Sequence, residues 1–218
     1  MNRKILIFAN GSTHDGPMPR RALEQSHGAQ AVAADGGVRV ARDYGVDLNM
    51  VIGDMDSVDA DELARLEAQG VSVQRYPREK NETDLEMALL WAVEQQADWV
   101  RVFGAMGGRL DQTMANIYLL ALPGLQDRDV RLVSRAQETW LIYPGEHCID
   151  GSKGDTVSLI PMSGDAYGIQ TENLYYPLRD ETLKFGPARG VSNVMDAEQA
   201  RVRLREGLLL VVHTIGRA

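Results

Sequence analysis

The sequence predicts two domains of different class, an α/β N-terminal domain with a mostly parallel sheet and a C-terminal all-β sandwich domain. Over residues 1–135, short apolar runs alternate with helix-like segments, which is typical of βαβ units. Over residues 136–218, short β patterns are separated only by turn residues, as in a sandwich or a partial barrel. A length of 218 residues suits one large domain or two small ones.

The strands of the first domain are predicted from six short apolar runs, most of which stop at strong turn residues. The first run is followed by Asn10-Gly11, the second by Asp35-Gly36-Gly37 and the third by Gly53-Asp54. Pro77 and Gly104 follow the fourth and fifth runs. The predicted strands are Lys4–Ala9, Ala29–Ala34, Met50–Ile52, Val71–Tyr76, Trp99–Phe103 and Val130–Val133.

Three helices are predicted between these strands. Asp59–Gln69 opens with a capping box and closes at a glycine. Thr83 caps the clearest helix, with Glu86 three residues later, and a third helix runs from near Leu110 to Pro123-Gly124. Helical spacing predicts one buried face in the second helix, formed by Leu85, Ala88, Leu89, Ala92 and Val93. In the third helix it predicts an apolar stripe of Leu110, Met114, Ile117 and Ala121.

The second domain contains six predicted strands. Arg201–Arg205 alternates strictly between charged and apolar residues, and Leu208–Val212 is continuously apolar. Glu206-Gly207 between them predicts a hairpin turn. The other predicted strands are Thr139–Tyr143, Thr156–Ile160, Tyr167–Gln170 and Thr182–Phe185.

Composition excludes several classes of function. The net charge of −8 argues against broad nucleic-acid binding, because a phosphate backbone requires clustered Lys and Arg. The single cysteine, Cys148, excludes an intramolecular disulfide and a Cys-rich zinc site, and it favours a cytoplasmic location. The apolar run after Met1 is too short for a signal peptide, and no stretch approaches a membrane span.

Four acidic motifs stand where a predicted strand ends or a predicted helix begins. They are Asp35-Gly36-Gly37, Gly53-Asp54-Met55-Asp56-Ser57, Thr83-Asp84 and Gly107-Gly108-Arg109-Leu110-Asp111. Because the carboxyl ends of parallel strands meet at one edge, where ligands bind in such sheets, we expect these carboxylates to converge there. Mg²⁺ held by a few carboxylates and by substrate phosphates would relieve their repulsion. The pattern therefore predicts a Mg²⁺–nucleotide site.

Each motif also has a purely structural interpretation. Each aspartate could simply cap the turn or helix beside it, and Asp84 would complement the dipole of its own helix. Lys80 either reaches a phosphate or lies in water. The glycine-rich loop before Asp111 is suited to bind an anion, and Arg109 either binds phosphate or pairs with a neighbour. Four such motifs at corresponding positions favour one shared site.

Six segments fit one family pattern: Ala34–Gly37, Gly53–Ser57, Lys80–Asp84, Gly107–Gln112 with Asn116, Thr171–Leu178 and Val191–Asn193. Together they resemble the thiamine pyrophosphokinase (thiamine diphosphokinase) family, from about residue 5 to residue 213. The resemblance implies that ATP and thiamine are the substrates and that pyrophosphate passes from ATP to the thiamine hydroxyl, releasing AMP. It also implies a homodimer with sites at the subunit interface.

The resemblance also implies a role for each domain and for individual residues. Residues 1–135 would form the nucleotide- and Mg²⁺-binding catalytic domain, and residues 136–218 the thiamine-binding and dimerisation domain. Asp35, Asp54, Asp56 and Asp84 would hold the metal. The residues that would bind ATP are Asn10, Asp35, Gly36, Lys80, Thr83, Gly107, Gly108 and Arg109. The residues that would bind thiamine are Asp111, Asn116, Tyr175, Ser192 and Asn193. The catalytic set would be Asp54, Asp56, Asp84, Arg109 and Asp111, with Asp84 or Asp111 taking the proton.

The chain departs from the family pattern at three places. Asn81 replaces an aspartate, Gln112 replaces a histidine and Glu172-Asn173 replaces a glycine. Three other functions remain open: a pyrophosphokinase for a hydroxymethyl pterin, a non-catalytic thiamine- or nucleotide-binding protein, and a Mg²⁺-dependent phosphohydrolase. Release of AMP with each acceptor alcohol distinguishes the two pyrophosphokinases. Tight thiamine binding without release of AMP would indicate the binding protein, and release of inorganic phosphate from ATP without an acceptor would indicate the phosphohydrolase.

Overall fold

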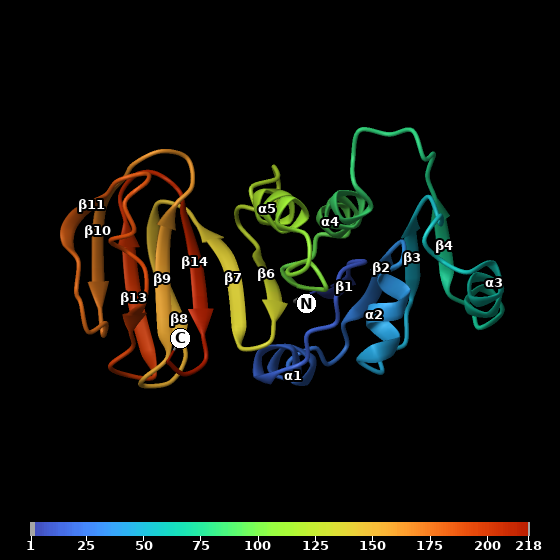
Figure 1. Ribbon diagram of the computed structural model, residues 1–218, viewed down its shortest axis with the longest axis horizontal. Coiled ribbons are helices and arrows are strands. Elements are labelled where there is room, and N and C mark those ends of the chain that lie inside the picture. Colours follow the sequence, from blue (N-terminus) through green and yellow to red (C-terminus); the bar gives the residue numbers. More distant parts are fainter. Residues whose placement is uncertain (1–2, 218) are drawn as a thin grey trace. The chain divides into compact units, whose positions relative to one another are not determined.

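The computed structural model describes residues 3–217, so Met1, Asn2 and Ala218 lie outside the described residues. The chain divides into two compact units, Met1–Arg135 and Ala136–Ala218. All five helices of the described residues belong to the first unit, drawn from blue to green in Figure 1. The second unit, drawn from yellow to red, consists of strands and their connections.

The first unit contains a six-stranded sheet in the order β6-β5-β1-β2-β3-β4. Every neighbouring pair is parallel, so the predicted parallel sheet is confirmed. Strand β1 lies at the centre, where Ile7 is opposite Val32 of β2 and Val102 of β5. The strands are β1 Lys4–Phe8, β2 Gln30–Ala34, β3 Met50–Gly53, β4 Ser72–Arg75, β5 Trp99–Phe103 and β6 Asp129–Ser134.

Helices cover both faces of this sheet, which is why β1, β2 and β5 read as nearly continuous apolar runs. Ala22 of α1 and Val40 of α2 join Phe8 and Phe103 in one core cluster. Helix α4 packs on β1, β2 and β3 and lies on the side opposite to α1 in Figure 1. The helices are α1 Pro17–Glu24, α2 Gly37–Asp43, α3 Ala60–Ala68, α4 Asp84–Glu94 and α5 Leu110–Leu119.

Two predicted helix starts are confirmed by their capping bonds. The Asp59 carboxylate accepts hydrogen bonds from the backbone N–H groups of Asp61, at 2.9 Å, and Glu62, at 3.3 Å. Thr83 Oγ1 accepts one from the Glu86 N–H at 3.2 Å. Helices α1 and α2 were not predicted, because neither has a side-chain cap and α2 begins at a glycine.

The apolar stripe predicted for α5 is largely exposed. None of its residues is buried, and Leu110 and Met114 are 75% and 39% exposed. Ile117 is only half-buried, and Ala121, beyond the helix, is exposed. The apolar spacing identified the helix correctly, but spacing alone does not say what the apolar face contacts.

The second unit consists of two antiparallel sheets, which confirms the predicted sandwich. One sheet has the order β12-β9-β14-β7 and the other β11-β10-β13-β8. Inward-facing residues from both sheets, such as Val157, Ile169 and Val211, form a single core cluster. The strands are β7 Gln137–Ile142, β8 Gly145–Asp150, β9 Thr156–Pro161, β10 Ala166–Glu172, β11 Arg179–Leu183, β12 Asn193–Val194, β13 Gln199–Leu204 and β14 Leu209–Thr214.

The predicted hairpin at Glu206-Gly207 is wrong. Strand β13 pairs with β10 and β8, whereas β14 pairs with β7 and β9, so the connection crosses from one sheet to the other. The turn is fixed to β10 instead, because the backbones of Tyr167 and Glu206 exchange hydrogen bonds of 2.9 and 3.2 Å. Strand sequences at this spacing specify a turn but not the partner of each strand.

Candidate active site

A cavity of about 630 Å³ opens at the carboxyl ends of β1, β2, β3 and β5. The strand order reverses beside β1, and such switch points are the usual ligand sites of open α/β sheets. Most residues predicted to bind nucleotide or metal line this cavity: Asn10, Asp35, Asp54, Asp56, Thr83, Asp84, Gly107, Gly108 and Arg109. Asn116, which was predicted to bind thiamine, lines it as well. The cavity is also lined by Ser12, Arg39, Ser57, Leu85 and Gln112.

The turn after β1 approaches the turns after β2 and β5 so closely that Gly36 and Gly11 have no room for a side chain. A Cβ atom on Gly36 would lie 2.5 Å from the side-chain atoms of Asn10. A Cβ atom on Gly11 would lie 2.0 Å from the carbonyl oxygen of Gly104. Gly11 therefore presents bare backbone to the cavity, which lets a ligand approach its N–H group directly.

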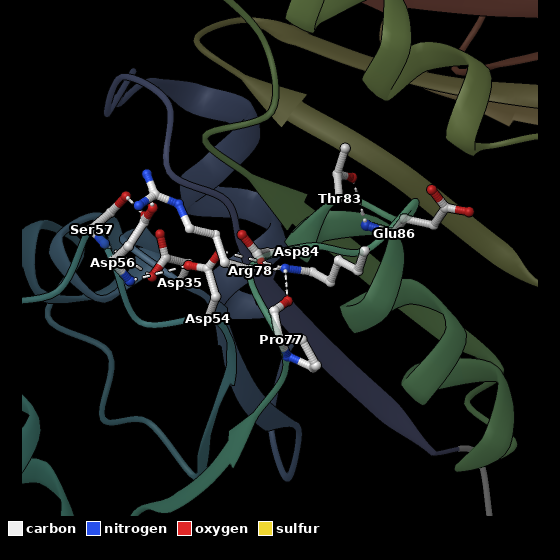
Figure 2. Close-up of polar contacts among 10 residues, drawn as sticks. Asp35, Asp54, Asp56, Ser57, Pro77, Arg78, Thr83, Asp84 and Glu86 are labelled. Atoms are coloured by element: carbon white, nitrogen blue, oxygen red, sulfur yellow. Dashed lines mark hydrogen bonds and ion pairs between the residues drawn. The ribbon is translucent and has the colours of Figure 1, made fainter.

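Three of the four predicted metal ligands converge at the edge of this cavity. Asp35, Asp54 and Asp84 each offer one carboxylate oxygen, and these oxygens lie within 4.8 Å of one another (Figure 2). Asp35 follows β2, Asp54 follows β3 and Asp84 is the first residue of α4. A Cβ atom on Gly53 would lie 2.9 Å from Asp35 Cβ and 3.0 Å from Asp84 Oδ1, so glycine is needed beside this three-carboxylate cluster.

Lys80 is paired with two members of the three-carboxylate cluster. Its Nζ lies 3.0 Å from Asp84 Oδ1 and 3.6 Å from Asp54 Oδ2, and its side chain is only 11% exposed. Burial raises the pKa of the Asp84 carboxyl, although the Lys80 ammonium opposes this. Burial also acts to lower the pKa of Lys80, but Asp84 and Asp54 outweigh it and leave that pKa raised.

Asp56 lies apart from the cluster. Its Oδ1 accepts a hydrogen bond of 3.0 Å from Ser57 Oγ, and its Oδ2 lies 3.1 Å from the Arg78 guanidinium, as Figure 2 shows. Asp54 connects the two groups, because its Oδ1 accepts a 3.1 Å bond from the Asp56 N–H. Arg78 was missed by sequence reasoning, since an isolated arginine in a loop carries no motif.

The loop between β5 and α5 is held by side chains of the helix. Thr113 Oγ1 accepts a 3.1 Å bond from the Gly107 N–H, and Asn116 Nδ2 donates a 2.7 Å bond to the Ala105 carbonyl. Arg109 and Asp111 form an exposed ion pair with a shortest distance of 2.5 Å. The Arg109 guanidinium thereby lowers the pKa of the Asp111 carboxyl.

The residues predicted to bind thiamine in the second unit surround one turn. Tyr175 and Tyr176, here called the tyrosine turn, are 63% and 65% exposed, and their rings meet edge to face with centroids 4.8 Å apart. Asn193 is buried, and its Oδ1 accepts bonds from the N–H groups of Tyr176, at 2.9 Å, and Val194, at 3.0 Å. Its Nδ2 donates a 2.8 Å bond to the Tyr176 carbonyl, and exposed Ser192 precedes it.

Two departures from the family pattern have a clear structural place. Gln112 lines the cavity, where its amide can donate or accept a hydrogen bond. Asn173 has a φ of 59°, a left-handed conformation that asparagine tolerates better than most residues with a side chain. Its Nδ2 also donates a 2.8 Å bond to the Gln199 carbonyl.

Comparison with known proteins assigns a family to both units. The signature described as "Thiamin pyrophosphokinase, catalytic domain" matches residues 23–133, and "Thiamin pyrophosphokinase, vitamin B1 binding domain" matches residues 146–209. The chain is 29% identical over 184 residues to thiamine pyrophosphokinase of Bacillus subtilis, covering 84% of this chain and 86% of the relative.

Two crystal structures share the fold along nearly the whole chain. That of thiamine pyrophosphokinase from Bacillus subtilis has a TM-score of 0.83 and 27% identity, covering 98% of this chain and 99% of the other. That of thiamin pyrophosphokinase from Geobacillus thermodenitrificans has a TM-score of 0.82 and 27% identity, covering 97% of each chain. No helix among residues 3–217 is long and apolar enough to cross a membrane.

Proposed function

The chain belongs to the thiamin pyrophosphokinase family, and from this premise we propose how its own residues move pyrophosphate from ATP to the hydroxyl of thiamine. The observation that carries the proposal is the carboxylate-edged cavity at the switch point, inside the segment matched by the catalytic signature. The β-phosphorus of ATP accepts the hydroxyl oxygen, and AMP leaves.

We assign Asp35, Asp54 and Asp84 as the ligands of Mg²⁺, with Asp56 beside them. The three-carboxylate cluster suits this ion, because its oxygens converge and a hard cation would relieve the repulsion that burial aggravates at Asp84. Bound there, Mg²⁺ would neutralise part of the charge on the ATP phosphates.

Around the phosphates, cations and backbone N–H groups supply the remaining stabilisation. We propose that Asn10, Gly36, Thr83, Gly107 and Gly108 position ATP, since they line or adjoin the cavity. Lys80 and Arg109 would stabilise the charge that develops on the transferred group and on AMP. This is catalysis by positioning and electrostatics.

The hydroxyl proton needs an acceptor at the cavity. Asp84 and Asp111 are the two candidates from the sequence, and their surroundings differ. Burial raises the pKa of Asp84, and Arg109 lowers that of Asp111. Because Mg²⁺ bound to Asp84 would in turn lower its affinity for a proton, we keep both carboxylates as candidate acceptors, and we assign Asp111 with Asn116 to orientation of thiamine.

The thiazolium cation of thiamine would find aromatic faces at Tyr175, beside Ser192 and Asn193. An exposed ring of this kind attracts a cation through its π-system. We further propose a cytoplasmic location, which suits the exposed free thiol of Cys148.

We also propose a homodimer with sites at the subunit interface. The exposed apolar residues Leu110, Met114 and Tyr118 support this, because they form one face of α5 directly after Arg109. A partner that covers this face would also close the neighbouring cavity to water.

The experiment that tests the function measures AMP release from Mg-ATP with thiamine, for wild type and Asp54→Asn. We expect wild type to release AMP and thiamine diphosphate in equal amounts. In the variant the rate should fall about 10²–10³-fold, as for removal of one key electrostatic contact. Thermal unfolding of both proteins controls for folding. An unchanged rate in the variant would refute the metal assignment, and AMP release with a hydroxymethyl pterin but not with thiamine would refute the acceptor.

A further inference from the structure

Lys80 occupies the place where the three-carboxylate cluster requires positive charge. Among residues 3–217, the ion pairs of Asp54 and Asp84 are both made with Lys80, at 3.6 and 3.0 Å. The nearby Arg78 is paired with Asp56 instead, at 3.1 Å. A partly buried ammonium thus balances carboxylates whose oxygens lie within 4.8 Å of one another.

The attachment of Lys80 allows this side chain to move. It belongs to the connection between β4 and α4, outside both elements, and four rotatable bonds separate its ammonium from the backbone. Besides the two carboxylates, the one further bond of Nζ within residues 3–217 is a long one of 3.4 Å to the Pro77 carbonyl. An ammonium held by charge rather than by directional bonds is readily exchanged for another cation.

We propose that Lys80 is a resident counter-ion of Asp54 and Asp84. Mg²⁺ displaces its ammonium from these two carboxylates, and the ammonium then turns toward the phosphates of ATP. The inference rests on the proposed metal site and adds an exchange to it. Lys80 therefore opposes metal binding in the absence of nucleotide and favours nucleotide binding once the metal is present. A residue with only a structural role would not change the two affinities in opposite directions.

The first test measures metal and nucleotide binding separately. Mn²⁺ binding without nucleotide is followed by electron paramagnetic resonance, and binding of Mg²⁺ with α,β-methylene-ATP by calorimetry. In Lys80→Met we expect Mn²⁺ to bind at least about tenfold more tightly and the analogue at least about tenfold more weakly, because a unit charge at about 4 Å in a partly buried site is worth this much. Weaker or unchanged Mn²⁺ binding would overturn the proposal.

Lys4→Met is the matched control for the loss of one positive charge. Lys4 starts β1 at the amino end of the sheet, away from the carboxyl ends that carry the cluster, and its Nζ donates a 2.6 Å bond to the Gln25 carbonyl. In Lys4→Met the affinities for Mn²⁺ and for the ATP analogue should both stay within about threefold of wild type, since charges separated by more than a Debye length are screened.

The second test uses the unaltered protein and so does not depend on folding of a variant. Amine acetylation is read by mass spectrometry at Lys80 and at exposed Lys153. Mg²⁺ should raise the Lys80 rate at least about threefold by releasing it from Asp84, and the ATP analogue should then protect it. A Lys80 rate unaffected by Mg²⁺ overturns the exchange while leaving the metal site intact. Equal Mn²⁺ binding by wild type and Asp54→Asn would instead refute the site itself.

Discussion

Replacing Asn193 by alanine tests whether this side chain holds the tyrosine turn in shape. Asn193 makes three hydrogen bonds, two to the backbone of Tyr176 and one to the Val194 N–H, and it is 9% exposed. All of its side-chain bonds in the structure are therefore made with the chain's own backbone. We expect Asn193 to shape the thiamine pocket through Tyr176 rather than by contact with the substrate.

The magnitude follows from the bonds that are lost. Each net hydrogen bond contributes about 0.5–1.5 kcal/mol, and water replaces part of the bonding at this half-exposed turn. The three bonds together therefore predict a loss of about 2–3 kcal/mol in the free energy of unfolding. For a chain of this size that corresponds to a decrease in Tm of about 4–12 °C.

Calorimetric unfolding and steady-state kinetics provide the measurements. Because the tyrosine turn would become less ordered, KM for thiamine should rise about tenfold while KM for ATP stays unchanged. Asn173→Gly is the control, since glycine accepts the φ of 59° there and only one exposed side-chain bond is lost. A Tm equal to the control would refute the positioning role. A tenfold higher KM for thiamine without loss of stability would point to direct contact with the substrate.

Three further predictions concern other parts of the molecule. Gly53→Ala should weaken Mn²⁺ binding at least about tenfold, because its Cβ would lie 3.0 Å from Asp84 Oδ1; unchanged binding by electron paramagnetic resonance would contradict this. Leu110→Glu with Tyr118→Glu should give monomers in sedimentation velocity if α5 lies in the dimer interface, and an intact dimer would exclude α5 from it. Burial acts to raise the pKa of Asp155, but bonds from Gly216, His213 and Ser152 leave it lowered. Its folded pKa therefore lies below its unfolded pKa, and the stabilisation, present at neutral pH, is lost as pH falls through the folded pKa. Tm should fall less between pH 6 and about pH 3 in Asp155→Asn than in wild type, and parallel curves would contradict the assignment.

The sequence predicted the parallel sheet because its evidence is local. Turn residues such as Asp35-Gly36 follow buried runs, and caps such as Thr83 start helices, so each signal lies within a few residues of the feature that it marks. The convergence of Asp35, Asp54 and Asp84 followed from the same argument, since parallel strands bring their carboxyl ends to one edge.

Features that depend on distant partners were not accessible in this way. The periodicity of α5 was correct, but none of its residues is buried by the part of the chain that the structure describes. The turn at Glu206-Gly207 is real, yet its contacts with Tyr167 direct β14 into the other sheet. Likewise, the pairing of Lys80 with Asp54 spans a chain reversal that no local pattern encodes.

Two carboxylates of the proposed metal site, those of Asp35 and Asp54, follow extensions of the sheet itself. The Asp35 N–H donates a 2.8 Å bond to the Ile52 carbonyl, and the Tyr76 N–H donates a 2.9 Å bond to the Gly53 carbonyl, so ladder-like bonding continues past the strand ends. Asp35 has a φ of 46°, a conformation that costs free energy for a residue with a side chain and persists only where its surroundings enforce it. The sheet thus fixes Asp35 and Asp54 before any ligand arrives. The repulsion between the carboxylates of the cluster is a cost of folding that Lys80 offsets and that a bound cation would remove.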